Sequence, residues 1–261
     1  MRTTYYNIFL LVFILLFSCE KPQETDSSNV TQQKTVTKKK KKNNRKLQRL
    51  HNGNVVSELT WYGEENPETK VKIITSFGDI IIKLYEDTPL HRANFIMLVK
   101  KGYFNDSQFY RVMKGFVVQG GDSDDFQFAN RKKRIGKYTI PAEINAKKHF
   151  HKRGAVSLAR SIKNNPEKRS SSFDFYITVG AKRDRAYMEA LEAESPGIQY
   201  SPEMIQAYKT LGGEPGLDGD FTVFGEVIEG MDVVEKITTV EVSEEDNWPL
   251  ESIYIKAEII E

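Results

Sequence analysis

Residues 110–122 read Tyr-Arg-Val-Met-Lys-Gly-Phe-Val-Val-Gln-Gly-Gly-Asp, and this stretch decides the fold. Two short apolar runs flank Gly115 and a double glycine closes the second, a pattern typical of two strands joined by a tight turn. Arg111 and Gln119 interrupt the apolar residues. A guanidinium near a ring such as Phe116 can hydrogen-bond a peptide group while the ring holds an apolar side chain. The stretch therefore indicates a groove that acts on polypeptide and not on a charged metabolite.

Further runs rich in β-branched and aromatic residues lie on both sides of this stretch. Residues 71–75 and 79–84 predict a hairpin. Other short strands are expected at 108–113, 116–119, 155–159, 173–179, 221–228 and 253–260. Short strands at this spacing, with glycine-rich turns and no regular alternation of strand and helix, favour a closed antiparallel barrel over a parallel sheet.

Two helices accompany the strands. The clearer one opens at Thr88-Pro89, with Thr88 as its N-cap, Pro89 in its first turn and Gly102 beyond its last turn. Residues 231–237 predict the second helix from the spacing of their apolar side chains.

An N-terminal extension over residues 51–70 precedes the first strand of the predicted barrel. Val55 and Leu59 fall at helical spacing, and Gly63 follows where a helix would end. We expect a short helix there that packs on the outside of the domain.

A charged insertion occupies residues 181–215, between two of the predicted strands. It contains a helix-prone run over 184–194 and a second helical pattern that begins at Ser201-Pro202. The apolar face of the second pattern is formed by Met204, Tyr208 and Leu211. Such a narrow stripe fits a surface decoration, a rim of the groove or a partner-binding face equally well.

The first residues of the chain look like a targeting segment. Residues 8–17 are an unbroken apolar run that follows Arg2, too short to span a bilayer and typical of a signal peptide. The run leads into Leu-Phe-Ser-Cys, and Cys19 is the only cysteine. This ending resembles the lipobox of bacterial lipoproteins, which implies removal of residues 1–18 and lipidation of Cys19. The alternative is an ordinary signal peptide with a chance cysteine. The lipoprotein interpretation predicts a protein anchored to a membrane of the bacterial cell envelope, facing the periplasm or the outer membrane.

Residues 19–50 predict a disordered, basic tether, because they hold few large apolar side chains that could offset the entropy of ordering. Residues 1–50 carry 11 Lys and Arg against 3 Asp and Glu, whereas residues 51–261 carry 27 against 33. The lysine run 38–42 is read either as a spacer or as an attachment to anionic lipid or nucleic acid. No aromatic residues interleave the lysines, which favours the spacer, and no nucleic-acid partner is expected.

The ordered blocks of the chain resemble one known family. Residues 109–122 are similar to the Phe-His-Arg-Val-Ile-Pro-Gly-Phe-Met-Ile-Gln-Gly-Gly-Asp segment of cyclophilin-type peptidyl-prolyl isomerases. The resemblance continues in order through 88–95, 154–159, 172–177, 217–225 and 229–234. It implies a mainly β fold for residues 71–261, a closed eight-stranded antiparallel barrel capped by two helices. It also implies catalysis without a cofactor and proline-containing polypeptides as binding partners.

The resemblance also implies roles for individual positions. Arg111 matches the catalytic arginine of the family, Phe116 the floor of the proline pocket, and Gln119 the glutamine that hydrogen-bonds the substrate backbone. The positions that it implies as substrate-binding are Val117, Ala159, Arg160, Asp174, Tyr176, Leu217 and Phe221.

Several groove positions depart from the family pattern. Arg160 stands where asparagine is usual, Asp174 where glutamine is usual, and Tyr176 replaces a phenylalanine. Gly216 replaces a tryptophan and Phe221 a histidine. We therefore expect an intact proline pocket beside an altered polar side. The new charges suggest an ion pair between Arg160 and Asp174, or a pair between Asp174 and Arg111 that would restrain the catalytic group.

The reaction implied is rotation about the peptide bond that precedes proline. Its barrier is about 18–20 kcal/mol, set by amide resonance, and no bond breaks, so that neither a nucleophile nor a metal is needed. A groove accelerates the rotation by binding the twisted state better than the planar states. The expected role is assistance in the folding of envelope proteins. The alternative is a membrane-tethered peptide-binding or chaperone module with weak or no isomerase activity.

Other chemistry finds little support in the residues. His149 and His151 have no carboxylate or cysteine partners at metal-ligand spacing, so no metal site is predicted. Residues 122–125 form an acidic cluster that fits a turn and lacks the rest of a calcium-loop pattern. The sequence predicts no oligomeric state.

Overall fold

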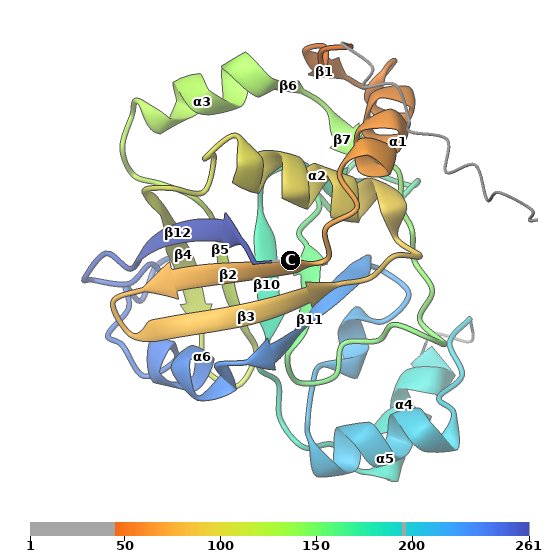
Figure 1. Ribbon diagram of the computed structural model, residues 1–261. Helices are drawn as coiled ribbons and strands as arrows, with labels where there is room; N and C mark the ends of the chain where they lie inside the picture. Colours follow the sequence, from red (N-terminus) through yellow and green to blue (C-terminus); the bar gives the residue numbers. More distant parts are fainter. Residues whose placement is uncertain (1–44, 195–196, 261) are drawn as a thin grey trace, which may run out of the picture. The chain divides into compact units, whose positions relative to one another are not determined.

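The computed structural model describes residues 45–194 and 197–260. Eight of its strands close into a barrel, in the order β10-β5-β4-β12-β2-β3-β11-β8 (Figure 1). All neighbouring pairs are antiparallel, which confirms the predicted architecture. The strands are β2 (Lys70–Thr75), β3 (Gly78–Leu84), β4 (Ser107–Met113), β5 (Val117–Asp122), β8 (Ala155–Leu158), β10 (Phe175–Thr178), β11 (Val223–Glu229) and β12 (Tyr254–Ile259).

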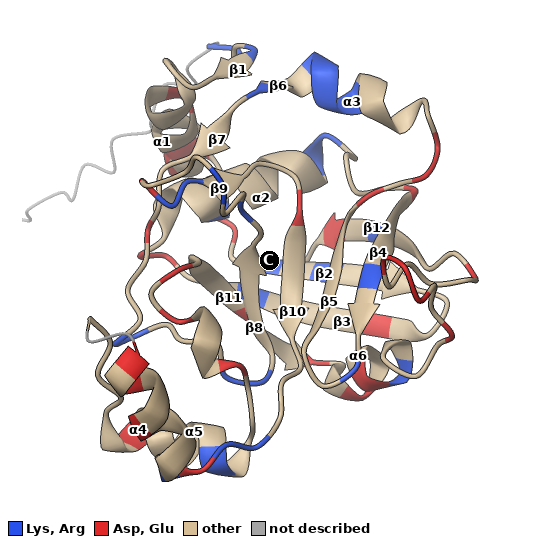
Figure 2. Ribbon diagram, turned by 180° about the vertical axis from the view of Figure 1, so that it is seen from behind, with Lys and Arg blue, Asp and Glu red and all other residues tan. Residues whose placement is uncertain are grey.

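The inside of the barrel is apolar and densely aromatic. Alternate residues of β3, Ile80 and Ile82, are fully buried, as the period of two in a half-buried strand requires. Phe95 of helix α2 (Pro89–Lys100) contacts the rings of Phe104, Phe175 and Phe224, with centroids 4.9, 5.5 and 5.4 Å apart. Helix α2 therefore belongs to the core. It lies over one end of the barrel, and α6 (Met231–Ile237), the second predicted helix, lies at the other end (Figures 1 and 2).

The first turn of α2 is capped by a residue far away in the sequence. Thr88 does occupy the N-cap position, but its side chain makes no capping bond and donates instead to the carbonyl of Tyr85. The backbone N–H groups of Leu90 and His91 donate to the Glu143 carboxylate at 3.0 and 2.9 Å. A carboxylate at a helix N-terminus also complements the helix dipole. Thr88 is thus the N-cap residue as predicted, but Glu143 makes the capping hydrogen bonds that a threonine side chain would supply.

The predicted N-terminal extension is a helix, α1 (Val55–Glu65), packed along α2. Glycine is common just after a helix, so the sequence predicted that Gly63 ends this one. Gly63 instead lies inside α1. A Cβ at that position would come 3.1 Å from the Cβ of Ala93 on α2. Gly63 therefore allows α1 and α2 to approach closely and does not cap α1.

The domain begins before residue 50, so the boundary predicted for the tether comes too late. Leu50 is 1% exposed, and β1 (Leu50–His51) pairs in parallel with β6 (Gly136–Lys137). Arg45 forms an ion pair with Glu58 and lies 4.5 Å from the centroid of the Trp61 ring. The predicted signal peptide, Cys19 and the tether up to residue 44 lie outside the described residues.

Several small elements were not predicted. They are helix α3 (Phe128–Ile135), the 3-10 turn Pro215–Leu217, and a two-stranded sheet of β7 (Thr139–Ile140) and β9 (Ser170–Ser171). Each is short or strongly charged, and therefore carries little periodic signal. Among the helices that the structure describes, none has the length and apolar character needed to span a bilayer.

The insertion contains the two helices expected, α4 (Arg185–Glu194) and α5 (Pro202–Thr210). They lie at the end of the domain opposite α1 and α3 (Figures 1 and 2). Ser201 caps α5 by accepting from the N–H of Met204 at 3.3 Å. Met204 and Tyr208 are buried as predicted, but Leu211 is 53% exposed, so the apolar face is narrower than the sequence suggested.

Replacing Gly121 by alanine is expected to destabilise the domain far more than replacing Gly115. Both glycines have positive φ, +106° and +71°, which costs alanine about 1–2 kcal/mol. A Cβ on Gly121 would also lie 2.2 Å from the carbonyl oxygen of Phe173, whereas one on Gly115 would meet no atom within 4 Å. Denaturant unfolding of both variants measures the difference, and equal losses would contradict the importance of this close approach.

Candidate active site

One hollow of about 590 Å³ gathers the predicted site residues on the face formed by β4, β5, β10 and β8. All of them except Asp174 line it: Arg111, Phe116, Val117, Gln119, Ala159, Arg160, Tyr176, Leu217 and Phe221. The remaining lining residues are Gly216, Ile162 and Asp220. Gly216 is one of the departures from the family pattern noted above, whereas Ile162 and Asp220 were not predicted. We call this hollow the groove.

The strand register explains why residues far apart in the chain meet there. Gln119 of β5 lies opposite Arg111 of β4 on one side and opposite Tyr176 of β10 on the other. Tyr176 in turn lies opposite Ser157 of β8. Residues directly opposite one another across a sheet point to the same face. Arg111, Gln119 and Tyr176 therefore line the groove together, while Ser157 is buried beneath the surface.

A β-bulge in β4 adds Tyr110 to the same face. Phe109 pairs with Gly120 and Arg111 with Gln119, so Tyr110 is an extra residue on its strand. In a regular strand Tyr110 and Arg111 would point to opposite faces, but a bulge can re-aim a side chain. Both reach Gln119: its Nε2 donates to the Tyr110 hydroxyl, and its Oε1 accepts from Arg111 Nη1 at 3.4 Å. Regular alternation of side chains along β4 predicts the opposite face for Tyr110, so the sequence did not indicate its contact with Gln119.

Arg111 has little else to bind. Within the described residues it forms no ion pair, and its one side-chain hydrogen bond is the long one to Gln119. Its guanidinium borders the groove beside Phe116 and Val117. The remaining donors of this group are therefore left for a molecule in the groove.

A family model described as cyclophilin type peptidyl-prolyl cis-trans isomerase/CLD matches residues 70–259. A putative peptidyl-prolyl cis-trans isomerase of Staphylococcus saprophyticus is 32% identical over 211 residues, covering 78% of this chain and all of the relative. One of Staphylococcus aureus is 31% identical over 191 residues, covering 73% of this chain and 90% of the relative. The chain belongs to the cyclophilin-type peptidyl-prolyl cis-trans isomerase family.

Solved structures agree with this isomerase fold. A crystal structure of a cyclophilin-type isomerase of Cryptosporidium parvum has a TM-score of 0.53 and 22% identity, and covers 74% of this chain and 98% of that one. A second crystal structure of that protein, in the presence of the dipeptide Ala-Pro, has a TM-score of 0.52 and 23% identity.

The two unusual charges of the isomerase groove do not pair with each other. Arg160 Nε donates to the backbone carbonyl of Asp220 at 2.6 Å, and its Nη2 lies 3.2 Å from Asp220 Oδ1. The guanidinium also lies 4.9 Å from the centroid of the Phe221 ring, and the side chain is only 7% exposed. The predicted pair between Arg160 and Asp174 is therefore wrong, because Asp220 already occupies the arginine.

Asp174 lies behind the groove and not in it. Its Oδ2 accepts from the Ser171 hydroxyl at 2.5 Å, and Tyr110 is a second hydrogen-bonding partner. No direct bond joins it to Arg111 in the described residues, so the restraint that we had considered is also absent. Burial, partly offset by the bond to Ser171, raises the pKa of the Asp174 carboxyl above its ordinary value.

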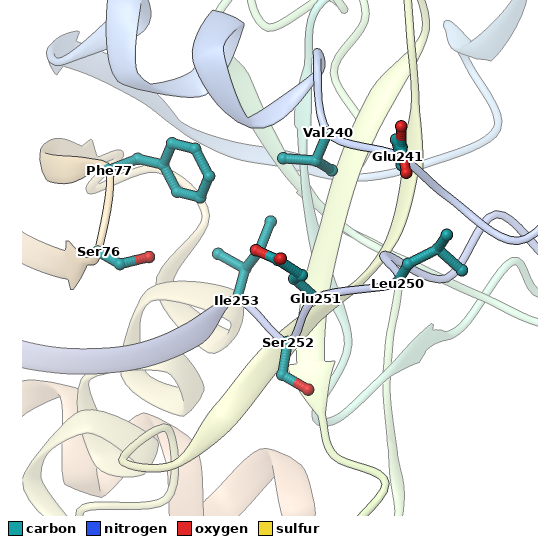
Figure 3. Close-up of a pocket in the computed structure, with 8 residues that line it drawn as sticks. All are labelled: Ser76, Phe77, Val240, Glu241, Leu250, Glu251, Ser252 and Ile253. Carbon is teal, nitrogen blue, oxygen red and sulfur yellow. The ribbon is translucent and has the colours of Figure 1, made fainter.

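A second hollow of the isomerase, of about 340 Å³, contains none of the predicted site residues. It lies between the β2–β3 turn, the segment after α6 and the residues before β12. Figure 3 shows the side chains of Phe77, Val240 and Ile253 converging on it. Glu241 and Glu251 are its charged lining residues, and no Lys or Arg of the described part of the chain borders it. Residues 45–194 and 197–260 contain no cluster of three or more side chains that could hold a metal ion.

The raised pKa of Asp174 predicts a pH-dependent comparison with Asp174→Asn. A carboxyl whose pKa is raised by folding favours the folded state at low pH and loses that contribution as the pH rises through the folded pKa. Wild type is therefore expected to lose stability relative to Asp174→Asn as the pH rises from below 3.8 to neutral. Thermal unfolding at several pH values measures this, with about 2–4 °C in Tm for each ~1 kcal/mol. A difference in Tm that stays constant with pH would refute it.

Proposed function

We propose that this isomerase acts on proline-containing segments of envelope polypeptides, with Arg111, Phe116 and Gln119 as its catalytic residues. The observation that carries the assignment is the meeting of a hydrogen-bond donor with free capacity, Arg111, and an apolar floor, Phe116, in one hollow. The other groove residues, above all Val117, Tyr176 and Leu217, form the walls against which a proline ring and its neighbours pack.

The chemistry follows from the loss of amide resonance during rotation. In the twisted state the lone pair of the prolyl nitrogen is localised on that atom, whereas in the planar amide it is delocalised into the carbonyl group. An Arg111 N–H directed at that nitrogen stabilises the twisted state, while the apolar pocket holds the ring. Gln119 is pre-oriented by Tyr110 and Arg111 and hydrogen-bonds the backbone of the substrate. A gain of ~6–7 kcal/mol in transition-state binding corresponds to about 10⁵-fold acceleration.

A tether at the N-terminus fits this role. Residues 1–18 are proposed to be a signal peptide and Cys19 to carry lipid, on the strength of the apolar run and the Leu-Phe-Ser-Cys ending. The isomerase domain would then work at a membrane of the bacterial envelope. Two acyl chains or more are needed for stable anchoring, and a modified cysteine with an acylated amine supplies them.

A second candidate is a peptide-binding module with weak isomerase activity. It is favoured by the altered polar side of the groove, where Arg160 is held by Asp220 and is not free to bind a peptide. Such a module would bind proline peptides through the same apolar pocket while accelerating their rotation little.

The Arg111→Ala variant is expected to lose about 10²–10³-fold in kcat/KM, because it removes a preorganised donor from the reacting nitrogen. Isomerisation of a proline tetrapeptide by the domain from residue 45 onward measures this. Lys114→Ala is the matched control, since Lys114 is an exposed cation of the same hairpin and does not line the groove. Peptide binding without acceleration in wild type would favour the second candidate, and equal activity in both variants would exclude a catalytic Arg111.

The Cys19→Ala variant is expected to move the protein out of the membrane fraction, because the lipid attachment site is lost. Fractionation and mass analysis of the mature N-terminus measure this. Replacing Lys38 to Lys42 by serine is the control and should leave the protein on the membrane. Release by the lysine replacement, but not by Cys19→Ala, would instead support electrostatic attachment to anionic lipid.

A further inference from the structure

A chain of buried polar side chains leads from the helical insertion to the groove. The Tyr208 hydroxyl of α5 donates to Asp218 Oδ2. Asp218 Oδ1 accepts from the backbone N–H of His151 and lies 2.8 Å from His151 Nδ1. His151 Nε2 lies 3.0 Å from the hydroxyl of Tyr176, which lines the groove. We call Tyr208, Asp218, His151 and Tyr176 the relay.

All four members of the relay are buried, with exposures of 0, 2, 1 and 4% in that order. Burial raises the pKa of both tyrosines far above the usual range, so both remain neutral hydrogen-bond donors. In such surroundings a polar atom without a hydrogen-bond partner is costly, because it has lost its hydration and gained nothing in return. Each member of the relay therefore depends on its neighbours.

The direction of the hydrogen bonds follows from Asp218. With Asp218 as the acceptor, the hydrogen-bond network assigns the ring N–H of His151 to Nδ1. Nε2 then accepts a hydrogen bond from the Tyr176 hydroxyl, with Ser157 Oγ 3.2 Å away as a further neighbour. The rings of His151 and Tyr176 are nearly parallel, 13° apart with centroids at 6.0 Å. The hydroxyl of Tyr176 is thus held from behind the groove, leaving its ring as the wall.

The insertion contacts the rest of the domain through an apolar cluster, its backbone and the relay. It has a small apolar cluster of its own, made of Met188, Tyr200, Met204 and Tyr208, which is separate from the main core. Its backbone is joined to the barrel near Gly213, which bridges to Lys152. Tyr208 is a member of both the cluster and the relay, so its hydroxyl is the point at which the insertion joins the relay.

We propose that the relay fixes the Tyr176 ring as a wall of the groove, and that the insertion sets the efficiency of isomerisation through it. Tyr208, Asp218 and His151 are then positioning residues and the insertion is more than a surface decoration. Loss of the Tyr208 hydroxyl leaves Asp218 Oδ2 unsatisfied, and the Asp218–His151 pair relaxes away from Tyr176. The inference rests on the proposed role of the groove.

A double-mutant cycle tests the proposal. Tyr208→Phe keeps the ring in the apolar cluster and removes one hydroxyl, and it is expected to lower kcat/KM about three- to tenfold. Tyr176→Phe is expected to have a similar effect. Because the relay acts only through the Tyr176 hydroxyl, the double variant should be no slower than Tyr176→Phe alone, a non-additivity that marks coupled residues.

Leu191→Ala is the control, since Leu191 packs against the same apolar cluster without belonging to the relay. It should lower Tm and leave kcat/KM unchanged. Additive losses in the double variant, or a Tyr208→Phe variant with lowered Tm and unchanged kcat/KM, would overturn the relay. If Arg111→Ala is also without effect, the proposed site itself fails, which separates the two outcomes. The ¹⁵N spectrum of His151 gives an independent readout, because an Nδ1-protonated ring is expected in wild type.

Discussion

The close approach of backbone at Gly120 and Gly121 is the constraint on which the groove depends. A Cβ on Gly120 would lie 2.9 Å from a ring carbon of Phe109, and one on Gly121 would overlap the carbonyl of Phe173. With both side chains absent, β5 lies tightly between β4 and β10. Gln119, one residue earlier, then stands between its partners on those two strands. The site is therefore a consequence of how closely the barrel strands can approach one another.

Several residues that the family resemblance placed in the groove lie on or beside barrel strands: Arg111, Val117, Gln119 and Tyr176 are in β4, β5 and β10, and Phe116 precedes β5. The register of regular strands brings such positions together. The residues that the sequence missed or misplaced depend on departures from regular structure. Tyr110 reaches Gln119 through a bulge, which no alternation pattern reveals. The partner of Arg160 is Asp220, sixty residues away, and only the three-dimensional arrangement shows that Asp220 is nearer than Asp174.

The same distinction holds for the fold. The barrel strands and α2 carry strong periodic signals and were predicted with small differences in their ends. The side chain that caps α2 could not be found in this way, because Glu143 is more than fifty residues from the two N–H groups that it binds. The start of the domain was placed too late for a related reason. In the sequence Arg45 belongs to a basic run that is typical of a tether. Only the structure shows that it binds Glu58 and Trp61 of the domain.

Two buried histidines show how similar chemistry acquires different roles. His91 joins Glu143 at 2.6 Å to Ser170 at 2.9 Å, which is the connectivity of a hydrolase triad. Ser170 is 1% exposed and none of the three lines a hollow described here, so a substrate could not reach its hydroxyl. The Glu143 carboxylate also accepts hydrogen bonds from the N-terminus of α2. This network therefore braces the core, in the sense that it fixes α2 against the rest of the domain. The network of His151 has the same burial but ends on a tyrosine whose ring borders the groove. The difference between bracing and positioning lies in whether the last member of each network borders the groove, and not in the residue types.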